Sequence, residues 1–315
     1  MTLASLPAMI TFQFPATFAL AGLTVRWETL LGAVAVLVAL LLAAAMARRT
    51  PVDLSAPADW PSPDPDDGPN HLRTDDLLYL VVAALPGALL GGRLGYALIH
   101  LDYYGANPSA LADINMGGLE LSMGVVGGTI TASIVVMLLG APLGRWLHAL
   151  AIPLLVLLGL VKFAMVFGGT GQGAPTDFSL ATRYLGPGPW GSLAPEVASW
   201  PSQAMEALAT VLAGGVAWSF MAVGVFRRRN GAAFFLAVGL WAIARLLVAG
   251  TWRDPAVAVT LSAAQLIALG IAIACALLIV GLAAASPNGR KRAAAADWDD
   301  WDDEGEAESL AWPSR

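Results

Sequence analysis

Charged side chains are scarce in this chain: Asp, Glu, Lys and Arg make up only 13% of its 315 residues, whereas hydrophobic residues make up 57%. A water-soluble domain is closer to one quarter charged, so this composition excludes an ordinary soluble protein and indicates an integral membrane protein. The mean hydropathy of +0.68 agrees. The few charges inside apolar segments therefore become the first candidates for function.

Cysteine is almost absent as well. The single cysteine, Cys275, excludes an intrachain disulfide, and its position in an apolar run predicts a packing role. Residues 1–22 lack the basic start of a secretory signal, so we do not expect cleavage there. The net charge of −6 says little about partners, because the acids cluster outside the apolar runs, and nucleic acid is not an expected partner.

Seven apolar runs are long enough to span a bilayer, which takes about 20 residues of helix. They lie at 28–47, 77–100, 121–140, 146–168, 203–226, 232–250 and 261–284. The sequence thus predicts an all-α integral membrane protein with about seven transmembrane helices. Basic residues follow alternate runs, at Arg48–Arg49, Arg145, Arg227–Arg229 and Arg290–Arg292. The positive-inside rule then places the N-terminus outside and the C-terminus inside.

The chain divides into a transmembrane domain at 1–284 and an acidic cytoplasmic tail at 285–315. Within the domain, 51–74 is expected to be a disordered cytoplasmic loop because it is rich in Pro and Asp. The segment 169–200, rich in Gly and Pro, is expected on the outer side. The tail reads AAAADWDDWDDEGEAE, an acidic block that repels itself; a solvated tail is favoured over a partner-binding one.

Several polar residues fall in the outer half of the membrane once this topology is applied. Three are cations, namely Arg93, Lys162 and Arg245; the others are Glu28, Ser122, Gln203 and Glu206. Charges facing lipid at that depth are costly, so we expect them to face one another across one cavity. Three cations at one depth suit an anionic lipid phosphate. The alternative is structural, with Arg93 paired to Glu206 or Glu28.

Six stretches between residues 23 and 255, two of them in the segment 91–128, carry a family resemblance. Gly91, Gly92 and Gly95 are expected to bring helix backbones close together. The stretches that match, in order, are LTVRWETLLGAVAV (23–36), GGRLGY (91–96), GGLELSMGVVGG (117–128), FGGTGQGAPTD (167–177), WPSQAMEAL (200–208) and RLLVAGTWRDP (245–255). Together they resemble the phosphatidylglycerol–prolipoprotein diacylglyceryl transferases, the bacterial membrane enzymes that attach lipid to lipoprotein cysteines.

The chain departs from the family pattern at several positions. The third stretch resembles G-G-L-S-F-H-G-G-L-I-G-G, and the histidine of that pattern falls on Ser122. Glu28, Lys162 and Met165 stand where the family has tyrosine, arginine and asparagine. Trp252 aligns with a family arginine unless a one-residue shift lets Arg253 serve.

The resemblance implies transfer of diacylglycerol from phosphatidylglycerol to the lipobox cysteine of preprolipoproteins in the bacterial inner membrane, with no metal or cofactor. Such a reaction needs a thiolate and a stabilised leaving phosphate. The implied substrate-binding residues are Arg93, Lys162, Arg245, Gln203, Tyr96 and Arg253. Ser122 occupies the catalytic histidine position but has no accessible basic form, so His100 or Glu206 are the candidate substitutes.

Two functions remain open at this point. The first is an active but divergent transferase. The second is a catalytically impaired homologue that binds anionic phospholipid without transferring it. A small transporter is disfavoured, because the sequence has no pair of interrupted helices in matching halves.

Overall fold

The computed structural model describes residues 9–51, 71–113 and 118–285. Seven of its helices are long and apolar enough to cross a membrane. They are α1 (Trp27–Arg48), α2 (Thr74–Ile99), α4 (Leu121–Leu138), α5 (Leu143–Gly168), α6 (Ser202–Ala222), α7 (Ala232–Val248) and α8 (Ala263–Ala284). The predicted multi-pass helical membrane protein is confirmed, with helix ends that differ from the apolar runs by a few residues. The acidic tail and most of the loop at 51–74 lie outside the described residues.

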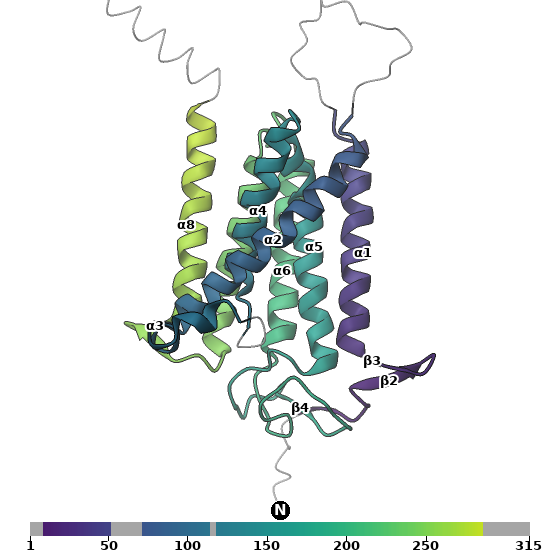
Figure 1. Cartoon of the computed structure of the whole chain (residues 1–315), viewed down its shortest axis with the longest axis vertical. Coiled ribbons are helices and arrows are strands. Elements are labelled where there is room, and N and C mark those ends of the chain that lie inside the picture. The colour runs from purple at the N-terminus through teal and green to yellow at the C-terminus, as the bar shows by residue number, and fades with distance from the viewer. Residues whose placement is uncertain (1–8, 52–70, 114–117, 286–315) are drawn as a thin grey trace, which may run out of the picture.

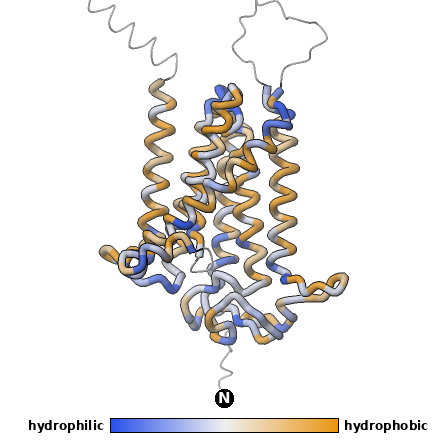
Figure 2. The backbone as a smooth tube through the Cα atoms, viewed as in Figure 1, coloured by the Kyte–Doolittle hydropathy of each residue, from blue (hydrophilic) through white to orange (hydrophobic). Residues whose placement is uncertain are grey.

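The helices lie side by side in one bundle, with α2 running obliquely across it (Figure 1). Hydrophobic residues follow the lengths of the helices, and hydrophilic residues gather mainly toward the two ends of the bundle (Figure 2). Helix α7 is the most enclosed of the seven and α8 the least. Within the apolar stretch of each helix, 56% of the residues are buried in α7 and 11% in α8. A charge on α7 is therefore held among other helices rather than against lipid.

Short elements complete one end of the bundle. Helix α3 (Leu101–Ala106) and the 3-10 turn η1 (Pro108–Leu111) follow α2, and η2 (Ala249–Thr251) follows α7. Six short strands pair in twos: β1 (Ile10–Phe12) with β4 (Thr182–Tyr184), β2 (Thr17–Leu20) with β3 (Leu23–Arg26), and β5 (Ala256–Ala258) with β6 (Leu261–Ser262). The sequence patterns did not predict these strands. Strand β4 belongs to the segment 169–200, which lies beneath the helices in the view of Figure 1.

Close backbone contact joins α2 to α4. A Cβ atom on Gly91 would overlap the carbonyl oxygen of Met123, and one on Gly95 would lie 2.6 Å from the Met123 Cβ. At Gly92 an added Cβ would lie 3.2 Å from the carbonyl oxygen of Glu120. The prediction that these glycines bring two helices together is confirmed. The contact also fixes the start of α4, where Glu120 and Ser122 lie.

Candidate functional site

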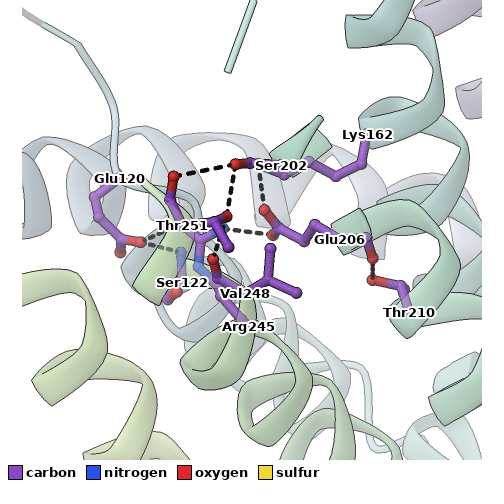
Figure 3. A network of polar contacts seen from close by, with 9 residues as sticks. All are labelled: Glu120, Ser122, Lys162, Ser202, Glu206, Thr210, Arg245, Val248 and Thr251. Carbon is purple, nitrogen blue, oxygen red and sulfur yellow. Dashed lines mark hydrogen bonds and ion pairs between the residues drawn. The ribbon is translucent and has the colours of Figure 1, made fainter. Parts of the chain in front are cut away.

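A buried arginine on α7 is the centre of the site. Arg245 is 4% exposed and donates hydrogen bonds to two carboxylates on different elements. Its Nη1 lies 2.6 Å from Glu206 Oε1 on α6, and its Nη2 lies 2.9 Å from Glu120 Oε1 just before α4 (Figure 3). Arginine suits this place because its planar fork can hold two acceptors at once.

A second cation completes the group. Lys162 on α5 is 8% exposed, and its Nζ lies 2.9 Å from Glu206 Oε2. Each oxygen of Glu206 thus faces one cation, and the four side chains form what we call the charge cluster: Glu120, Lys162, Glu206 and Arg245. Two positive and two negative groups offset one another, as buried charges require.

Glu120 is the member that sequence reasoning missed. It is the N-cap of α4, and its carboxylate accepts from the backbone N–H groups of Ser122 at 2.9 Å and Met123 at 2.7 Å. An acid directly before an apolar run is a recognisable capping signal, because the side chain satisfies the free N–H groups of the first turn. Its second role, as the partner of Arg245, could not be seen in the sequence.

Two polar atoms beside the cluster have no partner among the described residues. Ser122 is fully buried, and its Oγ makes no hydrogen bond. The Nε of Arg245 is also buried and unpartnered. Buried polar groups are usually paired, so these two mark a place where a polar ligand group would be accommodated.

An aromatic ring covers both cations. The ring centroid of Trp252 lies 4.6 Å from Arg245 Cζ and 5.6 Å from Lys162 Nζ. Such contacts stabilise a desolvated cation through the negative face of the ring. Trp252 is the position aligned with a family arginine, so an aromatic wall stands here in place of a further positive charge.

Gln203, on the first turn of α6, ties the site to the segment 169–200. Its Nε2 donates to the hydroxyl of Tyr184 at 2.9 Å, and that hydroxyl donates to the carbonyl of Val166 at 2.9 Å. Burial raises the pKa of Tyr184 above its usual value, so the phenol stays protonated and keeps donating. The Oε1 of Gln203 is buried without a partner among the described residues.

Arg93 does not join the other two cations, which corrects the expectation of three cations around one cavity. Its guanidinium donates to the backbone carbonyls of Ala110 at 2.6 Å, Asp113 at 2.7 Å and Leu111 at 2.9 Å. Neither Glu206 nor Glu28 is among its partners, so the structural clamp proposed as an alternative is wrong too. The physical reason is local: η1 lies close to α2 and presents backbone carbonyls to the Arg93 guanidinium.

The remaining candidates also lie apart from the charge cluster. His100 ends α2, is exposed, and stacks on Tyr96 with ring centroids 4.2 Å apart. Arg253 donates through Nε to the carbonyl of Gly173 at 2.8 Å. Glu28 accepts a hydrogen bond from the hydroxyl of Thr170 at 2.8 Å. Within the described ranges none of these side chains bonds to the cluster, and no three His, Cys, Asp or Glu side chains are grouped as a metal site.

The charge cluster lies within a segment that matches a known family. A model of the family described as prolipoprotein diacylglyceryl transferase matches residues 15–281. The chain belongs to this family. It is a multi-pass protein of the bacterial inner membrane, as that family is.

Curated relatives agree with the diacylglyceryl transferase assignment. The phosphatidylglycerol–prolipoprotein diacylglyceryl transferase of Geobacter sulfurreducens is 31% identical over 189 residues, which cover 58% of this chain and 67% of that protein. The one from Beijerinckia indica is 30% identical over 190 residues, covering 53% and 64%. The one from Trichormus variabilis is 27% identical over 169 residues, covering 54% and 53%. The chain thus aligns with between half and two thirds of the length of these transferases.

Two departures from the transferase pattern lie together at the start of α4. In G-G-L-S-F-H-G-G-L-I-G-G, serine stands where this chain has Glu120, and histidine stands where it has Ser122. Both positions begin α4, and Glu120 contacts Arg245 directly. The glutamate therefore adds a negative charge beside the Arg245 guanidinium.

Proposed function

We propose that this protein transfers the diacylglyceryl group of phosphatidylglycerol to the lipobox cysteine of preprolipoproteins. The observation that carries the proposal is the buried pairing of Lys162 and Arg245 around Glu206, within a chain of the transferase family. Buried cations at this depth suit a phosphate that must leave with its negative charge stabilised.

The chemistry sets two tasks for these residues. The cysteine sulfur forms a bond to the glycerol carbon that bears the phosphate, the carbon–oxygen bond breaks, and glycerol phosphate leaves with the bonding electrons. Lys162 and Arg245 would donate to the phosphate oxygens, and the unpartnered Nε of Arg245 offers a free N–H for this purpose. The thiol proton must go to an acceptor, since the thiolate is the nucleophile.

The proton acceptor is where this chain differs from its family pattern. Ser122 has no basic form at neutral pH, and both oxygens of Glu206 already face cations. His100 bonds to the backbone carbonyl of Tyr96 and to none of the cluster residues. We therefore propose slow transfer at neutral pH. Without a general base, only the fraction of the substrate cysteine that is already ionised would react.

Phosphate binding also has to compete with two carboxylates. Glu120 and Glu206 neutralise the positive charge of the cluster, so an incoming phosphate would displace one carboxylate from Arg245 or bind at its Nε. This makes the lipid-binding homologue without transfer the second candidate. The observation that favours it is that Ser122, at the position of the family histidine, is buried at the start of α4 and has no basic form at neutral pH.

We also propose that the end of the bundle carrying the charge cluster faces outward and that the ends with Arg145 and Arg227 face the cytoplasm. A single cysteine placed at Glu196, on the background Cys275→Ala, tests this. Labelling of intact cells by a membrane-impermeant thiol reagent is expected there. Labelling only after lysis would reverse the orientation.

A transfer assay tests the function itself. Full-length protein in phosphatidylglycerol vesicles is mixed with a lipobox peptide, and the thioether product is measured by mass spectrometry. We expect product from the wild type at a rate that rises toward the thiol pKa of about 8.5. Lys162→Gln should lower it at least tenfold, whereas Arg228→Gln, an exposed charge at the opposite end of the bundle, should not. Absence of product at every pH, with phosphatidylglycerol still bound, would favour the lipid-binding function instead.

A further inference from the structure

Two more unpartnered polar groups lie at the end of the bundle opposite the charge cluster. His148, in the second turn of α5, is 9% exposed, and its Nδ1 has no hydrogen-bond partner among the described residues. Arg229, between α6 and α7, has a buried Nη1 that is likewise unpartnered. Both are hydrogen-bonding groups whose burial without a partner is costly, so they call for a ligand.

The two residues line the same cavity. It has a volume of about 300 Å³ and is bounded by His148, Met221, Phe226, Arg227 and Arg229, with Pro51 and Gly224 at its edge. Two of the lining residues are arginines, and none is acidic. Met221 and Phe226 give it an apolar wall. We call this cavity the basic pocket.

The positive charges of the basic pocket are not offset by protein carboxylates. Within the described part of the chain, no ion pair includes Arg227 or Arg229. The charged groups acting on His148 are Arg229 and Arg145, both of the same sign. Arg145 donates to the carbonyl of Pro51 at 2.8 Å and so holds one edge of the pocket in place.

The backbone at Arg229 is unusual as well. Its φ of +47° lies in the left-handed region, which side-chain-bearing residues rarely adopt. The turn that holds it there is closed by a hydrogen bond from the Arg229 N–H to the carbonyl of Phe226 at 3.0 Å. Strained conformations of this kind concentrate at binding sites, where they aim a side chain.

We propose that the basic pocket binds the phosphate of an anionic phospholipid headgroup, drawn from the leaflet at this end of the bundle. The pocket lies where helices α5, α6 and α7 begin or end, which is the depth of lipid headgroups. Basic pockets between transmembrane helices are suited to such headgroups. Arg227 and Arg229 would hold the phosphate, His148 would donate from Nδ1, and the apolar wall would receive the glycerol and the first acyl carbons.

This site is separate from the one that would act on the donor lipid. Lys162 lies 14 residues after His148 on α5, which places the two about 20 Å apart along the helix. The proposal therefore does not depend on transferase activity. A lipid held here would stabilise the protein or report the composition of the inner leaflet without being consumed.

Native mass spectrometry of the full-length protein, titrated with phosphatidylglycerol or phosphatidylcholine, tests the proposal. Arg229→Gln should weaken retention of the anionic lipid about fivefold to tenfold and leave the zwitterionic lipid unchanged. Arg228→Gln is the matched control, because it removes the same charge from a neighbouring exposed residue that does not line the pocket. Lys162→Gln tests lipid binding at the charge cluster, so loss of lipid binding at one site can be distinguished from loss of binding at the other.

Three results would overturn the assignment. Equal weakening by Arg228→Gln and Arg229→Gln would mean diffuse surface charge rather than a pocket. Displacement of phosphatidylglycerol by inorganic phosphate from wild type but not from Arg229→Gln would mean a soluble anion is the ligand. If Arg229 affected lipid retention only after the acids of 297–308 were replaced by amides, that acidic segment would be the occupant.

Discussion

The carboxylate of Glu120 lies 2.9 Å from the guanidinium of Arg245, although 125 residues separate them in the chain. Glu120 caps α4 and Arg245 is near the end of α7, so this contact joins the α2–α4 pair to the α5–α7 group. It also means that Arg245, the arginine best placed to bind phosphate, already donates hydrogen bonds to two carboxylates.

Removal of Arg245 should destabilise the protein more than removal of Lys162. Arg245→Ala leaves Glu120 without its ion-pair partner and Glu206 with only one, and breaking a buried pair typically costs about 3–5 kcal/mol. Lys162→Ala leaves Glu206 still paired with Arg245. Thermal unfolding in detergent should show a larger fall in midpoint for Arg245→Ala. A larger fall for Lys162→Ala would contradict the pairing.

Among the fraction that folds, the same two variants should differ in lipid retention. Arg245→Ala should weaken binding of phosphatidylglycerol more than Lys162→Ala, because guanidinium can hold phosphate through two N–H groups whereas ammonium is a point charge. Native mass spectrometry with both lipid classes measures this. Equal retention of anionic and zwitterionic lipid by the wild type would count against an anionic site at the cluster.

Neutralising Glu120 should increase the affinity for anionic lipid. Glu120→Gln keeps an acceptor for the α4 cap but removes the negative charge beside Arg245, so a phosphate would meet a net positive cluster. We expect roughly tenfold tighter retention of phosphatidylglycerol, which corresponds to about 1.4 kcal/mol. Glu196→Gln, an exposed acid of the segment 169–200, is the control for net charge. Unchanged affinity in Glu120→Gln would show that Glu120 does not compete with the ligand.

Ser122→His should raise transfer at neutral pH. General-base assistance is typically worth about a hundredfold to ten-thousandfold, and a histidine at this buried position would begin to supply it. The wild type should be slow at pH 6–7 and recover as pH approaches the thiol pKa, whereas Ser122→His should depend less on pH. Fast wild-type transfer with a flat profile, lost in His100→Ala, would identify His100 as the existing base.

Alanine at Gly91 should destabilise the α2–α4 contact. An added methyl group would overlap the Met123 carbonyl, and overpacking typically costs about 1–3 kcal/mol. Gly32→Ala on α1 is the matched control, since nothing lies within 4 Å of its added Cβ. We expect a lowered unfolding midpoint for Gly91→Ala and an unchanged midpoint for Gly32→Ala. Equal midpoints would contradict the close approach of the two helices.

Alkaline pH should reduce the contribution of Tyr184 to the stability of the protein. Because burial raises the pKa of its phenol, the folded state holds the proton more tightly than the unfolded state, whose pKa is about 10. The stabilisation is complete below that pH and is lost as pH rises above it. Tyr184→Phe should therefore be less stable than wild type at pH 8, and the gap should shrink by pH 11. A constant gap would mean that the phenol does not titrate with unfolding.

The sequence by itself determined the membrane class, the seven helices and the family. Apolar runs of spanning length depend only on composition, and the motifs from Arg26 to Arg245 are read position by position. It also indicated that Lys162, Glu206 and Arg245 share a depth, because helical rise converts residue number into depth. The tertiary structure decided which of these residues meet, since depth leaves the direction of each side chain around its helix axis open. For that reason Arg93 on α2 proved to bind backbone carbonyls of the η1 turn, while Glu120, absent from every sequence argument, proved to contact Arg245.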